Sequence, residues 1–172
     1  MPNQQAIEAE ILTQATLDWL TDTQAAALAA LHSLVRYPNI VNLWGPTGTG
    51  KTFLCRVWAK AESVGVTYRA NLDVLQDNQQ HQREQLVLLD NLSAGDRPLR
   101  DAIAWLQLRG VVRAVLITQH PNELRLPMVA LSLPTQEDMD IVYRNLSELD
   151  RHPVSPVRPP ANLWDVLKSV LP

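Results

Sequence analysis

The stretch IVNLWGPTGTGKT at residues 40–52 decides the fold. Its second part fits the pattern G-x-x-x-x-G-K-[ST] at every fixed position. The apolar residues before it, 40–44, predict a buried strand, and residues 53–61 predict a helix. This strand–loop–helix context is the one that the pattern requires of a phosphate-binding loop. Three of the six glycines of the chain lie in this loop, and we refer to residues 45–52 as the glycine loop.

The chemistry expected of the glycine loop is the binding of a nucleoside triphosphate. Glycines allow successive backbone N–H groups to point inward at phosphates, and the following helix adds partial positive charge at its N-terminus. We expect Lys51 to reach the β- and γ-phosphates and the Thr52 hydroxyl to bind Mg²⁺. The predicted nucleotide-binding residues are Gly45, Pro46, Thr47, Gly48, Thr49, Gly50, Lys51 and Thr52.

The composition is that of one ordinary globular domain. The chain has 172 residues, of which 46% are hydrophobic and 19% charged,. A net charge of −3 provides no overall attraction to nucleic acid or to an anionic membrane,. Cys55 is the single cysteine, so we expect a buried thiol and no intramolecular disulfide,. With no signal peptide or membrane-spanning stretch apparent, we expect a soluble cytoplasmic protein.

Helical and strand patterns alternate along the rest of the chain. Helices are predicted for residues 4–20, 22–36, 96–109 and 136–149, and strands for residues 66–70, 86–89, 112–119 and 128–133,. Asp22 or Thr23 is the expected N-cap of the second helix. Gly110 is expected to be the C-cap of the helix predicted for residues 96–109. This alternation predicts an α/β fold, a three-layer P-loop NTPase sandwich with a central parallel sheet.

Two segments stand apart from this pattern. Residues 71–85 are polar and rich in glutamine, which fits a solvated loop or a segment that contacts a partner,. Residues 150–160 contain four prolines and predict an extended linker before a short helix at 163–171,. We therefore divide the chain into an ATPase domain with N-terminal helices, residues 1–149, and a linker with a C-terminal helix, residues 150–172.

A carboxylate follows the apolar run at residues 86–89. Asp90 ends this run 39 residues after Lys51, where a strand-end carboxylate beside the glycine loop would hold Mg²⁺ together with Thr52,. Asn91 comes next, and its amide cannot accept a proton from an attacking water, although it can orient one. The pair predicts a bound metal and slow hydrolysis.

Other polar residues are candidates for reading the γ-phosphate. Thr118 and Gln119 end the next strand, where one of them would lie between Asp90 and the phosphate,. Arg125 is the best-placed arginine to act on a neighbouring subunit, ahead of Arg144, Arg151 and Arg158. The histidines at positions 32, 81, 120 and 152 show no metal-ligand spacing,.

The order of the glycine loop, the run LVLLDN at 86–91 and the run VLITQHP at 115–121 resembles the AAA+ ATPase core, over roughly residues 24–149. Within that superfamily the Asp-Asn pair and the Leu-Ile-Thr strand are most similar to the replication initiator DnaA and its regulatory homologue Hda. The resemblance implies that residues 45–52 are Walker A, Asp90 is Walker B, and Thr118 or Gln119 is sensor 1. The family's arginine-finger segment and helical lid are shortened or missing here, which leaves Arg125 doubtful as a finger.

The resemblance implies an ATP- and Mg²⁺-binding switch or assembly factor with weak or partner-stimulated hydrolysis. Its output would be self-assembly or binding of a protein partner in a DNA transaction such as replication control or transposition, with DNA reached only indirectly. Two alternatives remain: a small-molecule phosphotransferase, and a non-hydrolysing interaction module that docks through its terminal helices. Fold alone does not choose among them.

Overall fold

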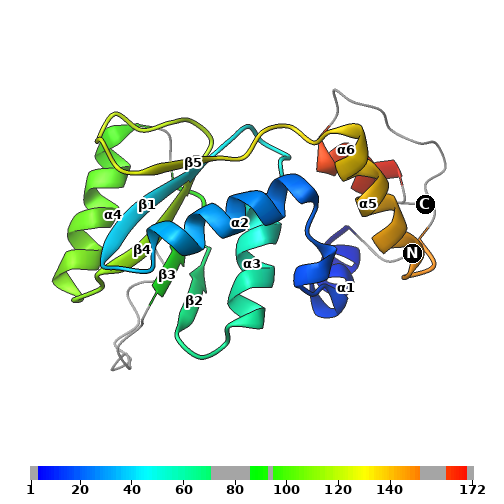
Figure 1. Ribbon diagram of the computed structural model, residues 1–172, viewed down its shortest axis with the longest axis horizontal. Helices are drawn as coiled ribbons and strands as arrows, with labels where there is room; N and C mark the ends of the chain where they lie inside the picture. The colour runs from blue at the N-terminus through cyan, green and yellow to red at the C-terminus, as the bar shows by residue number, and fades with distance from the viewer. Residues whose placement is uncertain (1–3, 71–85, 93–94, 152–161, 170–172) are drawn as a thin grey trace.

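A five-stranded parallel sheet forms the centre of the molecule (Figure 1). The computed structural model describes residues 4–70, 86–92, 95–151 and 162–169. The strands are β1 (Asn39–Trp44), β2 (Val66–Arg69), β3 (Leu86–Leu89), β4 (Arg113–Thr118) and β5 (Met128–Ala130). They follow the order β2-β3-β4-β1-β5, and every pair is parallel. The predicted α/β class with a central parallel sheet is confirmed.

Helices cover both faces of this sheet. On one face α2 (Asp22–Leu34) and α3 (Lys51–Ala61) pack against β1 and β4. Leu31 and Trp58 of these helices belong to one buried cluster with Leu43 and Ile117 of the sheet. On the other face α4 (Asp96–Leu108) covers the alternate side chains of β3 and β4. Parallel strands buried on both faces need continuous apolar runs, which explains the sequence of 86–89,.

A third cluster lies beyond α3, at the end of the molecule that holds α1 (Gln4–Gln14), α5 (Gln136–Ser147) and α6 (Leu163–Ser169) (Figure 1). Ile7, Met139 and Val166 are its fully buried members. The burial of Val166 means that the C-terminal helix packs on its own domain. Among the helices in the described part of the chain, none is long and apolar enough to cross a lipid bilayer.

Two predictions about the N-terminal helices are wrong. The helix expected over residues 4–20 ends at Gln14, and a separate 3₁₀ turn, Leu17–Trp19, follows extended backbone at Thr16. The N-cap of α2 is Thr21, where a capping box pairs it with Gln24. Asp22 and Thr23 were plausible by residue type, but the box requires a cap three residues before its glutamine.

The remaining boundaries differ from the predicted ones by a few residues. β5 is shorter than the expected 128–133, with Leu131 N adding one more hydrogen bond to Trp44 O (2.8 Å). Gly110, at φ +71°, follows the last turn of α4 as expected of a glycine after a helix,. The glutamine-rich segment 71–85, most of the proline-rich linker, and residues His81, His152 and Arg158 lie outside the described residues.

Candidate functional site

The glycine loop connects β1 to α3 at the carboxyl edge of the sheet. Asp90 follows β3 and Gln119 follows β4 at the same edge, because the strands are parallel. A cavity of about 610 Å³ opens there, and its lining includes the loop, the ends of β3 and β4, and parts of α1, α2 and α5. In open α/β sheets the crevice beyond the carboxyl ends of the strands is where ligands bind.

The conformation of the loop depends on two of its glycines. Gly48 has φ +83° and Gly50 has φ +86°, a region that other residues rarely adopt,. A Cβ atom on Gly48 would lie 2.3 Å from Cβ of Asn162, and one on Gly50 would lie 2.2 Å from Nε2 of Gln24. Both positions therefore require glycine for backbone angle and for space.

The beginning of α6 packs against the loop, and Leu163 also lines the cavity. Leu163 N donates a hydrogen bond to Gly48 O (2.8 Å), and a Cβ on Gly50 would come within 2.8 Å of Leu163 Cδ1. Asn162 and Asp165 fix this end of the helix by exchanging backbone-to-side-chain hydrogen bonds. The C-terminal segment is thus a structural part of the candidate site, which the sequence did not indicate.

Lys51 occupies the centre of the loop and is nearly buried. Its ammonium group donates to Gly45 O (2.6 Å) and Pro46 O (2.8 Å). Burial lowers the pKa of Lys51 from its ordinary value, and the charge of Asp90 opposes that effect,. The lysine predicted to bind phosphate therefore satisfies its donors with the carbonyl groups of its own loop.

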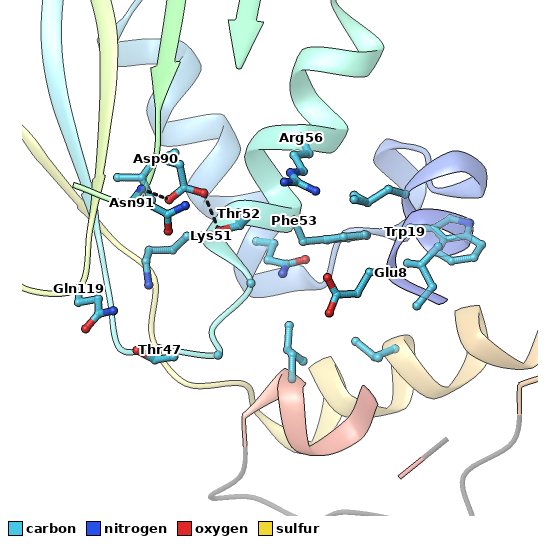
Figure 2. Close-up of a pocket in the computed structure, with 18 of the residues that line it drawn as sticks. Glu8, Trp19, Thr47, Lys51, Thr52, Phe53, Arg56, Asp90, Asn91 and Gln119 are labelled. Atoms are coloured by element: carbon cyan, nitrogen blue, oxygen red, sulfur yellow. Dashed lines mark hydrogen bonds between the residues drawn. The ribbon is translucent and has the colours of Figure 1, made fainter. Parts of the chain in front are cut away.

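Asp90 receives hydrogen bonds from three different elements. The Thr52 hydroxyl and the Tyr68 hydroxyl both donate to Oδ2, each at 2.7 Å, and Asn91 N donates to Oδ1 at 2.7 Å. Figure 2 shows the bond from Thr52 across the loop. Burial, and then the hydrogen bond to Asp90, raise the pKa of Tyr68 well above its ordinary value, so its hydroxyl stays protonated. The sequence placed Thr52 and Asp90 together but gave no sign of Tyr68.

Asn91 and the end of β4 also lie at the cavity. Asn91 is exposed, has φ +53°, and its side-chain amide donates to Ala70 O (3.1 Å). Gln119 is exposed and lines the cavity (Figure 2). Thr118 is nearly buried, and its hydroxyl donates to His120 O (2.7 Å). Both residues line the main cavity, and Gln119 is the one whose side chain is exposed.

A buried polar network behind β4 explains the position of Thr118. Asn42, fully buried in β1, donates to Leu116 O and to the Thr118 hydroxyl, each at 2.9 Å. Asn122 in turn donates to the side-chain oxygen of Asn42 (2.8 Å). These bonds hold the end of β4 beside β1. In the sequence, the sign of this network is an asparagine within an otherwise apolar strand.

The arginines are arranged differently from the sequence-based expectation. Arg125 is exposed and lines a separate shallow cavity of about 410 Å³ beside α4. Arg144 is exposed, and Arg151 forms an ion pair with Glu10 at 2.9 Å. Arg56 instead lines the main cavity, one helical turn after Thr52 on α3 (Figure 2). Its guanidinium lies over the ring of Tyr68. The spacing of four residues from Thr52 could have identified it.

The cavity becomes apolar away from the loop. Ile11 from α1, Trp19, Phe53 from α3, and Val142 and Leu146 from α5 line this end. Figure 2 shows Glu8 reaching from α1 toward the same space. A polar end with a lysine and a carboxylate, continuous with an apolar end, suits a ligand that has both charged and apolar parts.

The donors present fit a phosphate group together with a small hard cation. A helix N-terminus, glycine backbone and Lys51 suit phosphate oxygens, and Mg²⁺ is commonly bound through one or two protein oxygens with phosphates and waters completing its shell. Within the described ranges, no group of three or more His, Cys, Asp or Glu side chains could hold a metal by itself. Cys55 is fully buried, and burial raises the pKa of its thiol, so it belongs to the core.

No protein-family model matches this chain, and no curated protein matches its sequence.

Proposed function

We propose that this protein binds ATP and Mg²⁺ as an AAA+-like switch with slow or partner-stimulated hydrolysis. The observation that carries the proposal is the convergence of Lys51, Thr52 and Asp90 on one cavity that is polar at the glycine loop and apolar beyond it. A nucleotide has the same division between a charged and an aromatic part. The choice of ATP over GTP comes from the resemblance to AAA+ proteins.

In this proposal the glycine loop holds the phosphates through its backbone N–H groups and the N-terminus of α3. Lys51 exchanges its present acceptors, Gly45 O and Pro46 O, for phosphate oxygens. Because the ammonium group gives up two hydrogen bonds as it gains ligand contacts, part of the gross interaction energy is offset. Partial burial of Lys51 strengthens the remaining attraction, since water screens it less,.

Thr52 and Asp90 would hold Mg²⁺, which neutralises charge on the phosphates during phosphoryl transfer. The bond between the Thr52 hydroxyl and Asp90 Oδ2 already places both oxygen groups side by side. Tyr68 and Asn91 N hold the carboxylate from two other directions. The carboxylate is therefore oriented by the protein before any cation arrives.

Slow hydrolysis follows from the residues that face the expected position of the attacking water. Asn91 provides an amide where a carboxylate would accept a proton. Gln119 can orient water or report the state of the γ-phosphate, but it is not a base. Arg56 of α3 lines the cavity, whereas Arg125 lines a different cavity beside α4.

The output of such a switch would be self-assembly or the binding of a protein partner. A DNA transaction is suggested by the DnaA- and Hda-like features, and the net charge of −3 favours contact with DNA through a partner over direct binding,. The alternative in which α6 binds a partner as a free helix is disfavoured, because Val166 of α6 is fully buried in the protein. No observation specifically favours a phosphotransferase; transfer of phosphate to a nucleoside panel would test it.

The test is ATP binding and turnover by the purified chain, measured by calorimetry and phosphate release over a range of protein concentrations. Lys51→Ala should abolish measurable binding, while Arg36→Ala, which removes an exposed positive charge at the end of α2, should not. Asn91→Glu should raise turnover, since general-base catalysis contributes about 10²- to 10⁴-fold.

These measurements test separately whether ATP binds, where it binds and why its hydrolysis is slow. Absence of ATP binding by the intact chain would refute the proposal. Binding that survives in Lys51→Ala would show that ATP occupies another site. Turnover that does not increase in Asn91→Glu would refute the explanation of slow hydrolysis while leaving nucleotide binding in place.

A further inference from the structure

Gln24, the third residue of α2, carries a buried hydrogen-bond donor that the described part of the protein does not satisfy. The residue is 1% exposed, and its Nε2 atom has no hydrogen-bond partner among the described residues. A buried donor left unpaired costs about 1–3 kcal/mol. Such groups in native proteins need an explanation, and a ligand acceptor is one.

The orientation of this amide is fixed by its other end. Thr21 N donates to Gln24 Oε1 (3.1 Å) as one half of the capping box. A backbone N–H needs an acceptor, so the oxygen must face Thr21, and Nε2 must face the opposite way. The other half of the box, Gln24 N to Thr21 Oγ1 (3.3 Å), holds the backbone in register.

Nε2 therefore lies at the glycine loop. A Cβ atom built on Gly50 would be 2.2 Å from it, so the amide packs directly against the residue that precedes α3. Gln24 also lines the main cavity. The unpaired donor is thus beside the helix N-terminus at which an anion would bind.

We propose that Gln24 is a ligand-binding residue whose Nε2 donates a hydrogen bond to a phosphate oxygen of the nucleotide bound at the glycine loop. This inference rests on the proposed function and adds a contact from outside the loop. It also gives the capping box two roles: the oxygen of Gln24 caps α2, and the nitrogen binds the ligand. Ligand binding would satisfy a donor that the empty protein leaves buried.

The test compares Gln24→Ala with Thr21→Ala in the full chain. Both variants break the same capping box, but Thr21→Ala keeps the amide of Gln24. The probes are ATP and inorganic tripolyphosphate, each titrated by calorimetry, with urea unfolding of every variant as the measure of the helix cap. We expect similar losses of stability in the two variants. We expect both probes to bind Gln24→Ala about tenfold more weakly than Thr21→Ala, the ratio typical of losing one hydrogen bond to a charged group.

Three results would overturn this inference. Equal affinities of the two variants for ATP would mean that Gln24 acts only as a cap. If Gln24→Ala loses affinity for ATP but not for tripolyphosphate, the group that accepts the hydrogen bond lies outside the phosphates. A wild-type chain that binds neither probe would refute the proposed function itself, and the wild-type titration reveals that case separately.

Discussion

Asp138 joins α5 to α2, and its replacement by asparagine is expected to weaken the end of the molecule that closes the cavity. Its carboxylate accepts hydrogen bonds from Thr135 N (2.9 Å), which caps α5, and from Thr23 N (3.1 Å) and the Thr23 hydroxyl (2.5 Å) of α2. The residue is 1% exposed. Two helices distant in sequence are therefore held by one side chain.

The size of the effect follows from the number of acceptors lost. An asparagine keeps one oxygen, and its NH₂ group must face either Thr135 N or Thr23 N, both of which are donors. The Thr23 hydroxyl can rotate to accept, but the backbone group cannot. One backbone N–H therefore loses its acceptor, and a buried unpaired donor costs about 1–3 kcal/mol. The bond from the backbone N–H of residue 138 to Thr135 Oγ1 is kept. We expect Asp138→Asn to lower the free energy of unfolding by about 1–3 kcal/mol.

The effect should depend on pH. Burial alone would raise the pKa of Asp138, but the hydrogen bonds from Thr23 and Thr135 outweigh burial, and the pKa is below its ordinary value. A lowered pKa stabilises the fold at pH values above the unfolded pKa of about 3.9, and this stabilisation is lost as the pH falls through the folded value. The difference in free energy of unfolding between wild type and Asp138→Asn should be constant from neutral pH to about pH 5 and shrink below about pH 4.

Urea unfolding followed by tryptophan fluorescence measures this difference. With a slope of about 2 kcal/mol per molar urea, the midpoint should fall by about 0.5–1.5 M. Asp140→Asn is the matched control, since Asp140 lies on the same helix, is exposed, and accepts a bond from exposed Gln136. A midpoint for Asp138→Asn equal to that of Asp140→Asn, or a difference that persists unchanged to pH 3, would refute the reasoning.

Three other substitutions or treatments give separate checks. Gly48→Ala should destabilise the chain and abolish ATP binding, because φ is +83° and the added Cβ meets Asn162; near-wild-type calorimetric binding would contradict the described loop. Tyr68→Phe should raise the Mg²⁺ concentration needed for half-maximal ATP binding by about tenfold, because the tyrosine orients Asp90,; an unchanged Mg²⁺ dependence would assign Tyr68 to packing alone. Cys55 should react with a thiol reagent only after unfolding,, and rapid labelling of the native chain would show that the core opens.

The sheet and the core of the site could be predicted because the relevant signals are local. Continuous apolar runs define central strands, and the glycine loop has fixed residues at fixed positions. Asp90 could be placed beside Thr52 because residues at the carboxyl ends of parallel strands share one edge. The assignment of these residues to ATP and Mg²⁺ remains a prediction.

What could not be predicted depends on contacts between distant segments. Tyr68 reaches Asp90 only because β2 pairs with β3, and the sequence does not give that register. The difference between Thr118 and Gln119 depends on Asn42, which bonds to the nearly buried Thr118 hydroxyl, while Gln119 is exposed. The burial of Gln24 likewise depends on its packing against Gly50, which is distant in sequence.

The hydrogen bond from Leu163 N to Gly48 O has a consequence for the ligand side of the loop. A peptide group is planar and trans, so its carbonyl and the next residue's N–H point in opposite directions. With the Gly48 carbonyl held toward α6, the N–H of Thr49 is turned away from that helix,. The α6 helix thus fixes the orientation of the peptide between Gly48 and Thr49 before a ligand binds. The conformational entropy of that peptide is therefore lost during folding, so its loss does not reduce the affinity for the ligand.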